Sequence, residues 1–166
     1  MTGLDQFVED GVFVYPGLEW GMTPAEVSAV TGWPLEKAAY SSDGDDTYEL
    51  HEIPYGGEEW TAQVQFMRDG GLWCVSLLQE GKIRKAEKLF DSMDADFTEM
   101  LGEPDPGHYR MIKEYGDRRM IISEANWKSA SEEAPSRMQL YCSYQEGQDT
   151  AFLGLIVMHP AHGSEN

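Results

Sequence analysis

The sequence predicts an α+β protein built from two tandem units, each a short helix followed by an antiparallel β-meander. Three observations lead to this prediction: helix start and stop residues within Gly17–Pro34, a second helical pattern over Lys82–Leu101, and strand-like runs separated by turns after each helix. The units are expected to span residues 1–81 and 82–166, and at 166 residues they can also share one compact domain.

The first helix is predicted from the residues at its start. Thr23 is placed as the N-cap, Pro24 follows at the first helical position, and Glu26 completes a capping box with Thr23. Val27 and Val30 share one side of the helix. These features predict one short helix with a narrow apolar stripe.

The second helix is predicted over Lys82–Leu101 because apolar residues recur there at spacings near three and four. They are Ala86, Leu89, Phe90, Met93, Phe97 and Met100. A break near Asp91–Asp94 into two shorter helices is the alternative.

Strand-like runs of the first unit lie at Val12–Tyr15, Tyr48–Ile53, Trp60–Arg68 and Leu72–Leu78. The last two form a hairpin around Asp69-Gly70-Gly71, and Pro54 is expected to end the strand before them. Asp5–Asp10 is interpreted as one helical turn and Ser41–Asp46 as a loop. Strands of the second unit are expected at His108–Tyr115, Arg119–Trp127, Arg137–Tyr144 and Phe152–His159.

The two units also align with each other. Ala25–Pro34 lies over Ala95–Pro104 without a gap at an offset of 70, and each segment ends in a Gly-x-Pro stop. Gln63–Phe66 lies over Gln139–Cys142 at an offset of 76, so the helix, its stop and the final hairpin recur in the same order. This agreement predicts an internal repeat.

The chain carries a net charge of −18, most of it in the first unit. Residues 1–81 contain 15 acidic and two basic residues, whereas residues 82–166 contain 15 acidic and ten basic residues. Such a chain repels nucleic acid and anionic membranes, so neither is expected as a partner. The simpler explanation of this acidity is solubility alone. The alternative is a docking surface for a basic region, either in a separate protein or at Lys82–Lys88 of this chain.

The expected location is cytoplasmic. No run of residues is long and apolar enough for a membrane span, and the start Met-Thr-Gly-Leu-Asp lacks the basic and apolar parts of a signal peptide. Cys74 and Cys142 lie in strand-like runs, so we expect buried, reduced thiols rather than a redox pair.

Motifs for catalysis and metal binding are weak. The sequence has no Gly-x-Ser-x-Gly elbow and no Gly-rich phosphate loop. The carboxylates of Asp43–Glu49 lack EF-hand spacing, and His159 and His162 have no neighbouring ligands. No catalytic residue, metal ligand or cofactor is therefore predicted. A hydrolase with a Cys and His that meet in space stays as a minor alternative.

Aromatic residues give the better indication of function. A sheet covered by helices on one side leaves its other side open, where Trp and Tyr can anchor a partner. The candidate binding residues are Trp20, Trp33, Trp60, Trp127 and Tyr141. The alternative is that the tryptophans fill the core, and we expect this for at least three of the five in the chain.

A family resemblance rests on Gly21–Val27 followed by Gly32-Trp33-Pro34, which resembles the helix motif of the SmpA/OmlA outer-membrane lipoprotein family. The tandem order of helix and meander is similar to the fold of beta-lactamase inhibitor proteins. No lipid-bearing Cys lies near Met1, so the lipoprotein role is not carried over. The resemblance implies a non-enzymatic, protein-binding or inhibitory module that uses an exposed sheet face or loops. The alternative is a small-molecule-binding domain with an apolar cleft between the units.

Overall fold

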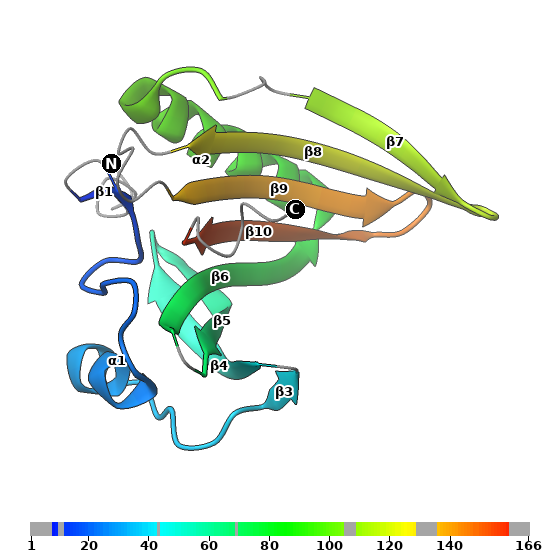
Figure 1. Ribbon diagram of the computed structural model, residues 1–166. Helices are drawn as coiled ribbons and strands as arrows, with labels where there is room; N and C mark the ends of the chain where they lie inside the picture. Colours follow the sequence, from blue (N-terminus) through cyan, green and yellow to red (C-terminus); the bar gives the residue numbers. More distant parts are fainter. Residues whose placement is uncertain are drawn as a thin grey trace.

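The structure, a computed structural model, describes residues 8–9, 12–42, 44–68, 70–104, 109–128 and 136–159. This part of the chain forms one eight-stranded antiparallel sheet, a separate two-stranded sheet and two helices (Figure 1). The α+β class and the antiparallel pairing agree with the sequence-based prediction.

The helices are α1 (Pro24–Thr31) and α2 (Ile83–Leu101). The strands are β1 (Val8–Glu9), β2 (Val12–Phe13), β3 (Tyr40–Ser42), β4 (Asp45–Tyr55), β5 (Glu58–Met67), β6 (Gly71–Lys82), β7 (Tyr109–Tyr115), β8 (Arg118–Lys128), β9 (Arg137–Gln145) and β10 (Thr150–Met158).

The large sheet consists of two meanders joined at their last strands. Its order is β3-β4-β5-β6-β10-β9-β8-β7, and β6 pairs with β10 in the middle, with Leu77 opposite Leu155. Because this central pair belongs to both halves, the two halves share one continuous sheet.

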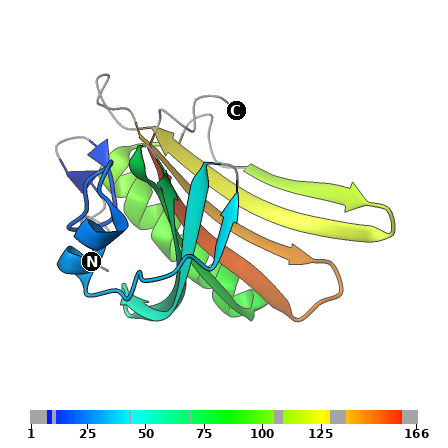
Figure 2. The same cartoon turned by 60° about the horizontal axis from the view of Figure 1, so that its bottom comes forward.

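The helix α2 covers one face of this sheet (Figure 2). Its buried side chains are Ala86, Phe90, Met93 and Phe97, and the helix contacts β6, β9 and β10. The alternative break near Asp91–Asp94 does not occur, since burial of one continuous apolar stripe outweighs the low helix propensity of the aspartates. In the described chain, neither helix combines the length and apolar character needed to cross a membrane.

The predicted ends of α1 are confirmed. The Thr23 hydroxyl accepts the Glu26 N–H at 3.2 Å, the Glu26 carboxylate accepts the Thr23 N–H at 3.3 Å, and Gly32 ends the helix with φ of 78°. The apolar stripe is narrower than predicted, because Val27 is buried but Val30 is 52% exposed.

A short backbone contact fixes the start of α1 to β6. The Gly21 N–H donates to the Leu72 carbonyl at 3.0 Å, and the Leu72 N–H donates to the Met22 carbonyl at 2.8 Å. A Cβ at Gly71 would lie 2.2 Å from the Gly21 oxygen, so only glycine permits this approach.

Three local predictions in the first half are wrong. Val8–Glu9 is a strand rather than part of a helical turn, and the rest of that predicted turn lies outside the described residues. Ser41–Asp46 contains the end of β3 and the start of β4 rather than only a loop. Pro54 lies inside β4 because β3 pairs only as far as Thr47, and β4 is therefore an edge strand at Pro54.

The two helices differ in length and position. α1 has 8 residues and lies beside one end of the sheet, whereas α2 has 19 and crosses a face (Figure 1). Each helix precedes four antiparallel strands along the chain. The two helices are therefore not alike, although each precedes four strands.

Candidate functional site

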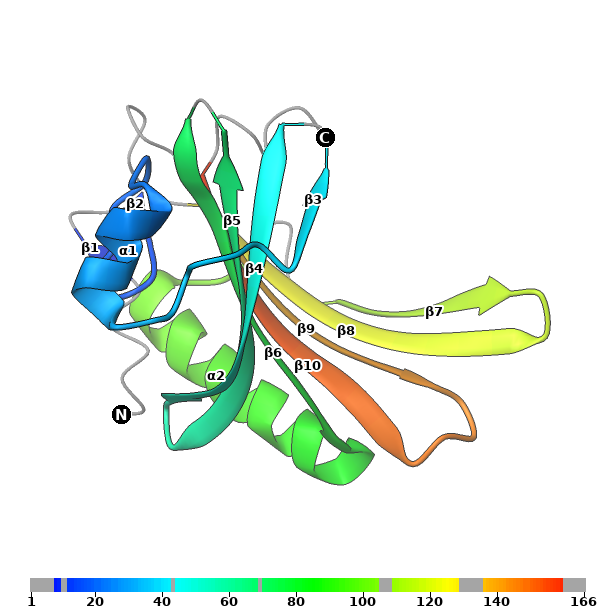
Figure 3. The ribbon, with the colours of Figure 1, turned by 90° about the horizontal axis from the view of Figure 1, so that it is seen from below.

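The face of the sheet away from α2 is not covered by either described helix (Figure 3). Side chains alternate along a strand, so residues between the buried core positions point to this face. We call it the open face. Residues on this face include Gln63, Leu78, Glu124, Asn126, Gln139, Tyr141, Phe152 and Ile156. Cys74 and Ser76 of β6 are on the same face but are buried.

A row of mostly apolar side chains crosses the open face from β10 to β7. Phe152 of β10 is 52% exposed and lies opposite Ser143 of β9. Ser143 lies opposite Ile122 of β8, which in turn lies opposite Met111 of β7. Exposed apolar groups beside uncharged polar ones are typical of protein interfaces.

Tyr141 is the one predicted binding residue at the centre of the open face. Its ring occupies the space above Gly154 on β10, where a Cβ would lie 2.3 Å from Tyr141 Cε1. Burial raises the pKa of the Tyr141 phenol. Tyr141 is therefore uncharged at neutral pH and offers a ring and a hydroxyl to a partner.

Two of the predicted tryptophans belong to the core. Trp60 and Trp127 are each 3% exposed. The Trp60 indole N–H donates to the Tyr55 carbonyl at 2.9 Å, and that of Trp127 donates to the Gly102 carbonyl at 3.0 Å. Both indole rings are therefore enclosed in the core with their N–H groups satisfied by backbone carbonyls.

The other two predicted tryptophans lie in the N-terminal segment, and Trp20 also packs edge-to-face against His159, with 6.0 Å between the ring centroids. Trp20 is partly buried and donates its indole N–H to the Phe13 carbonyl at 2.9 Å. Trp33 is partly buried against Tyr15, with 5.2 Å between the ring centroids. The structure thus brings none of the four tryptophans together with Tyr141.

Both cysteines are buried free thiols, as predicted. Burial raises the pKa of Cys74 to about 12. Burial, with Glu87 and Asp91 nearby, raises the pKa of Cys142 to about 11. Both thiols are protonated at neutral pH, which makes them poor nucleophiles.

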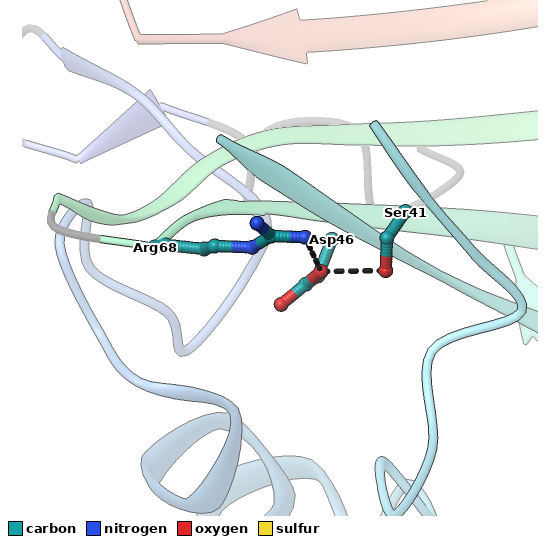
Figure 4. Close-up of polar contacts among 3 residues, drawn as sticks. All are labelled: Ser41, Asp46 and Arg68. Atoms are coloured by element: carbon teal, nitrogen blue, oxygen red, sulfur yellow. Dashed lines mark hydrogen bonds and ion pairs between the residues drawn. The ribbon is translucent and has the colours of Figure 1, made fainter. Parts of the chain in front are cut away.

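A hollow of about 390 Å³ opens between the start of α1 and the ends of β4, β5 and β6. Its charged groups bind each other: Asp46 Oδ1 accepts from Ser41 Oγ at 2.7 Å and from Arg68 Nη2 at 3.3 Å (Figure 4). These contacts, the Ser41 hydrogen bond first, lower the pKa of Asp46. The Thr23 hydroxyl at its rim is already engaged in the helix cap.

A second hollow lies where the β4–β5 hairpin of the first half meets α2 of the second. It is lined by Tyr55, Trp60 and Met93, among others, and has a volume of about 20 Å³. That is room for roughly one water molecule, whereas ligand pockets measure about 300–1,000 Å³.

Metal-binding residues do not cluster in the described part of the chain. There, no group of three or more His, Cys, Asp or Glu side chains is arranged to hold a metal ion. Asp43 and His162, from the two weak motifs in the sequence, lie outside the described residues.

Phe152 and its polar neighbours were missed as site residues by reasoning from the sequence. The alternation in Thr150–Met158 could have identified Phe152, because it falls between Ala151 and Leu153, which are both fully buried. Which residues neighbour it depends on the pairing of β6 with β10, which no local pattern specifies.

Comparison of the chain with protein-family models, with curated proteins and with solved structures finds no match. The geometry and charge of the described residues therefore carry the functional proposal.

Proposed function

We propose that this protein is a non-enzymatic binding module that holds a protein partner, as an inhibitor does, on the open face. The observation that carries the proposal is Phe152, which is 52% exposed on the sheet face that neither described helix covers. Ser143, opposite Phe152 on β9, and Tyr141, two residues before it on the same face, add uncharged hydrogen-bonding groups beside this anchor. Buried free thiols support a reducing compartment, and we place the module in the cytoplasm.

The proposed partner is basic. Exposed Glu49 and Glu59 lie at open-face positions of β4 and β5, and Glu80 lies opposite Phe152. The net charge of −18 adds a long-range attraction for a cationic surface. Such complementarity speeds association and makes binding sensitive to salt.

Affinity capture from the source cells with three baits tests this proposal. The baits are the unchanged protein, Phe152→Glu, and Val30→Glu as a matched control, because Val30 is also 52% exposed but lies on α1. We expect the unchanged protein and Val30→Glu to retain the same partner, and this binding to weaken as salt is added. The partner should bind the Phe152→Glu variant with an affinity lower by about tenfold or more. A purified partner that binds all three equally would contradict use of the open face.

Small-molecule binding is the alternative, and the hollow beside α1 is the observation that favours it. Its volume of about 390 Å³ is large enough for a metabolite, and its wall carries Arg68 and Asp46, which are paired with each other at 3.3 Å. A thermal-shift screen against metabolites, repeated with Arg68→Ala, tests this function. A compound that stabilises the unchanged protein but not the variant supports it.

We also propose that the two halves are repeats with the fold of beta-lactamase inhibitor proteins. The first half also carries the motif that resembles SmpA/OmlA lipoproteins, at Gly21–Val27 and Gly32–Pro34. The aligned Gly32 and Gly102 support the repeat, since both cap a helix with positive φ and donate their N–H to the carbonyl four residues earlier at 2.8 Å. Gln63 and Gln139 both lie on the third strand of their meander and on the open face. Superposition of residues 20–80 on 90–160 in an experimental structure tests the repeat.

A further inference from the structure

The strand β7 is a long exposed edge of the sheet (Figure 1, Figure 2). In the described chain it pairs with β8 along all seven of its residues and with no other strand, whereas the opposite edge, β3, has three residues. Native sheets protect long edges with proline, bulges or charged side chains. β7 has no proline and no bulge, and its charged side chains are Arg110, Lys113 and Glu114. Ile112 and Tyr115 on this strand are 54% and 51% exposed.

We infer that β7 is the interface of a homodimer in which the β7 strands of two copies pair antiparallel about a two-fold axis at Ile112. In this register Arg110 lies opposite Glu114 of the second copy, and symmetry forms this pair twice. Ile112 meets Ile112 of the second copy between the two ion pairs. All of these residues share one face, because they alternate along the strand.

Other registers match less well. The axis of such a pair is perpendicular to the sheet, so opposed residues must share a face and the axis must pass through a residue position. An axis at Met111 puts Arg110 opposite Ile112, and an axis at Lys113 puts the two Lys113 side chains opposite each other. Among these three neighbouring registers, the one centred on Ile112 brings opposite charges together.

The proposed pair also continues an apolar row. Ile112 lies opposite Ile121 on β8, and Ile121 lies opposite Tyr144 on β9. Ile121 and Tyr144 are partly buried, whereas Ile112 at the end of the row is exposed. Pairing with a second copy would bury Ile112 and extend the row across the axis.

Charge favours this location for contact between two acidic chains. Residues 109–128 contain five basic and three acidic residues, in a chain of net charge −18. Glu114 is 72% exposed and lies 3.7 Å from Arg119, which is closer to Glu146 at 3.0 Å. Arg110 donates to the Tyr144 hydroxyl at 3.0 Å and has further N–H groups for a carboxylate.

Sedimentation velocity over a range of concentrations tests the dimer. We expect a reversible monomer–dimer equilibrium for the unchanged protein. Glu114→Arg and Arg110→Glu each place like charges opposite each other twice, so each should raise the dimer dissociation constant about tenfold or more. Glu36→Arg and Arg84→Glu, which make the same charge changes at exposed positions elsewhere, should leave it unchanged.

Mixing the two interface variants provides the decisive measurement. A chain with Glu at 110 and Glu at 114 opposes a chain with Arg at both positions, so the mixture should form a heterodimer although neither variant self-associates. Rescue in the mixture also shows that both variants are folded. A protein that stays monomeric at all concentrations, a dimer insensitive to Glu114→Arg, or a mixture without rescue would overturn the inference.

Discussion

Replacing Gly154 by alanine is expected to destabilise the fold through one neighbour, the ring of Tyr141. The new Cβ would lie 2.3, 2.4 and 2.6 Å from Cε1, Cζ and the hydroxyl oxygen of Tyr141. Gly154 is not among the glycines with positive φ, so alanine carries no backbone strain there. Overpacking of this kind costs about 1–3 kcal/mol.

The Tyr141→Ala background separates this contact from every other effect of the substitution. Without the ring, alanine at 154 fits and even gains about 0.5–1 kcal/mol over glycine in a strand. The double-mutant cycle should therefore give a coupling of about 2 kcal/mol between the two positions. Gly81→Ala is the matched control, because nothing lies within 4 Å of its Cβ position.

Urea denaturation measures these differences, and calorimetry should show a fall of about 2–4 °C per kcal/mol for a chain of this size. In Gly154→Ala the displaced Tyr141 ring loses burial, so its raised pKa should return toward its ordinary value in an absorbance titration. The reasoning would be refuted if Gly154→Ala cost the same free energy with and without the Tyr141 ring.

Three further changes test other parts of the structure. Thr23→Ala should cost about 1 kcal/mol by removing the α1 cap, and an unchanged denaturation midpoint would show that the cap is not made. Replacing Lys82, Arg84 and Lys85 by Gln removes the exposed ion pair between Lys85 and Glu58, whose charged atoms are 3.5 Å apart. We expect the free energy of unfolding to fall by less than about 1 kcal/mol at low salt and by nothing at high salt. A variant whose stability depends on salt in the same way as that of the unchanged protein would contradict this contact. The raised pKa of Cys74, about 12, means that the folded state keeps a proton that the unfolded thiol loses above about pH 8.5, so stability should fall as pH rises through this window. Cys74→Ala should flatten that fall, and a parallel curve would refute the assignment.

Elements with strong local patterns could be predicted from the sequence. The cap of α1 depends on Thr23 and Glu26 only, and the β5–β6 hairpin depends on alternation around one glycine turn. The four strands of the second half start and end within two residues of prediction, because turn residues separate them. In these segments local chemistry and the tertiary fold agree.

The features that could not be predicted from the sequence depend on tertiary contacts. Pro54 is tolerated in β4 only because β3 is too short to pair there. Val30 has the character of a core residue, yet α1 lies beside the sheet and not across it, so Val30 is exposed. Trp60 and Trp127 fill the core because backbone carbonyls satisfy their indole N–H groups, a contact invisible in the sequence.

The two proposed surfaces make separate and combined predictions. A two-fold axis perpendicular to the sheet keeps each face on its own side, so the open faces of two paired copies would lie side by side on one surface. A dimer would therefore present two Phe152 anchors to a partner, and binding to an immobilised partner would gain from avidity. Phe152→Glu should weaken each contact but leave the dimer intact. Glu114→Arg should abolish the avidity and leave the affinity of a single copy unchanged, because β7 lies at the sheet edge rather than at the Phe152 anchor on β10.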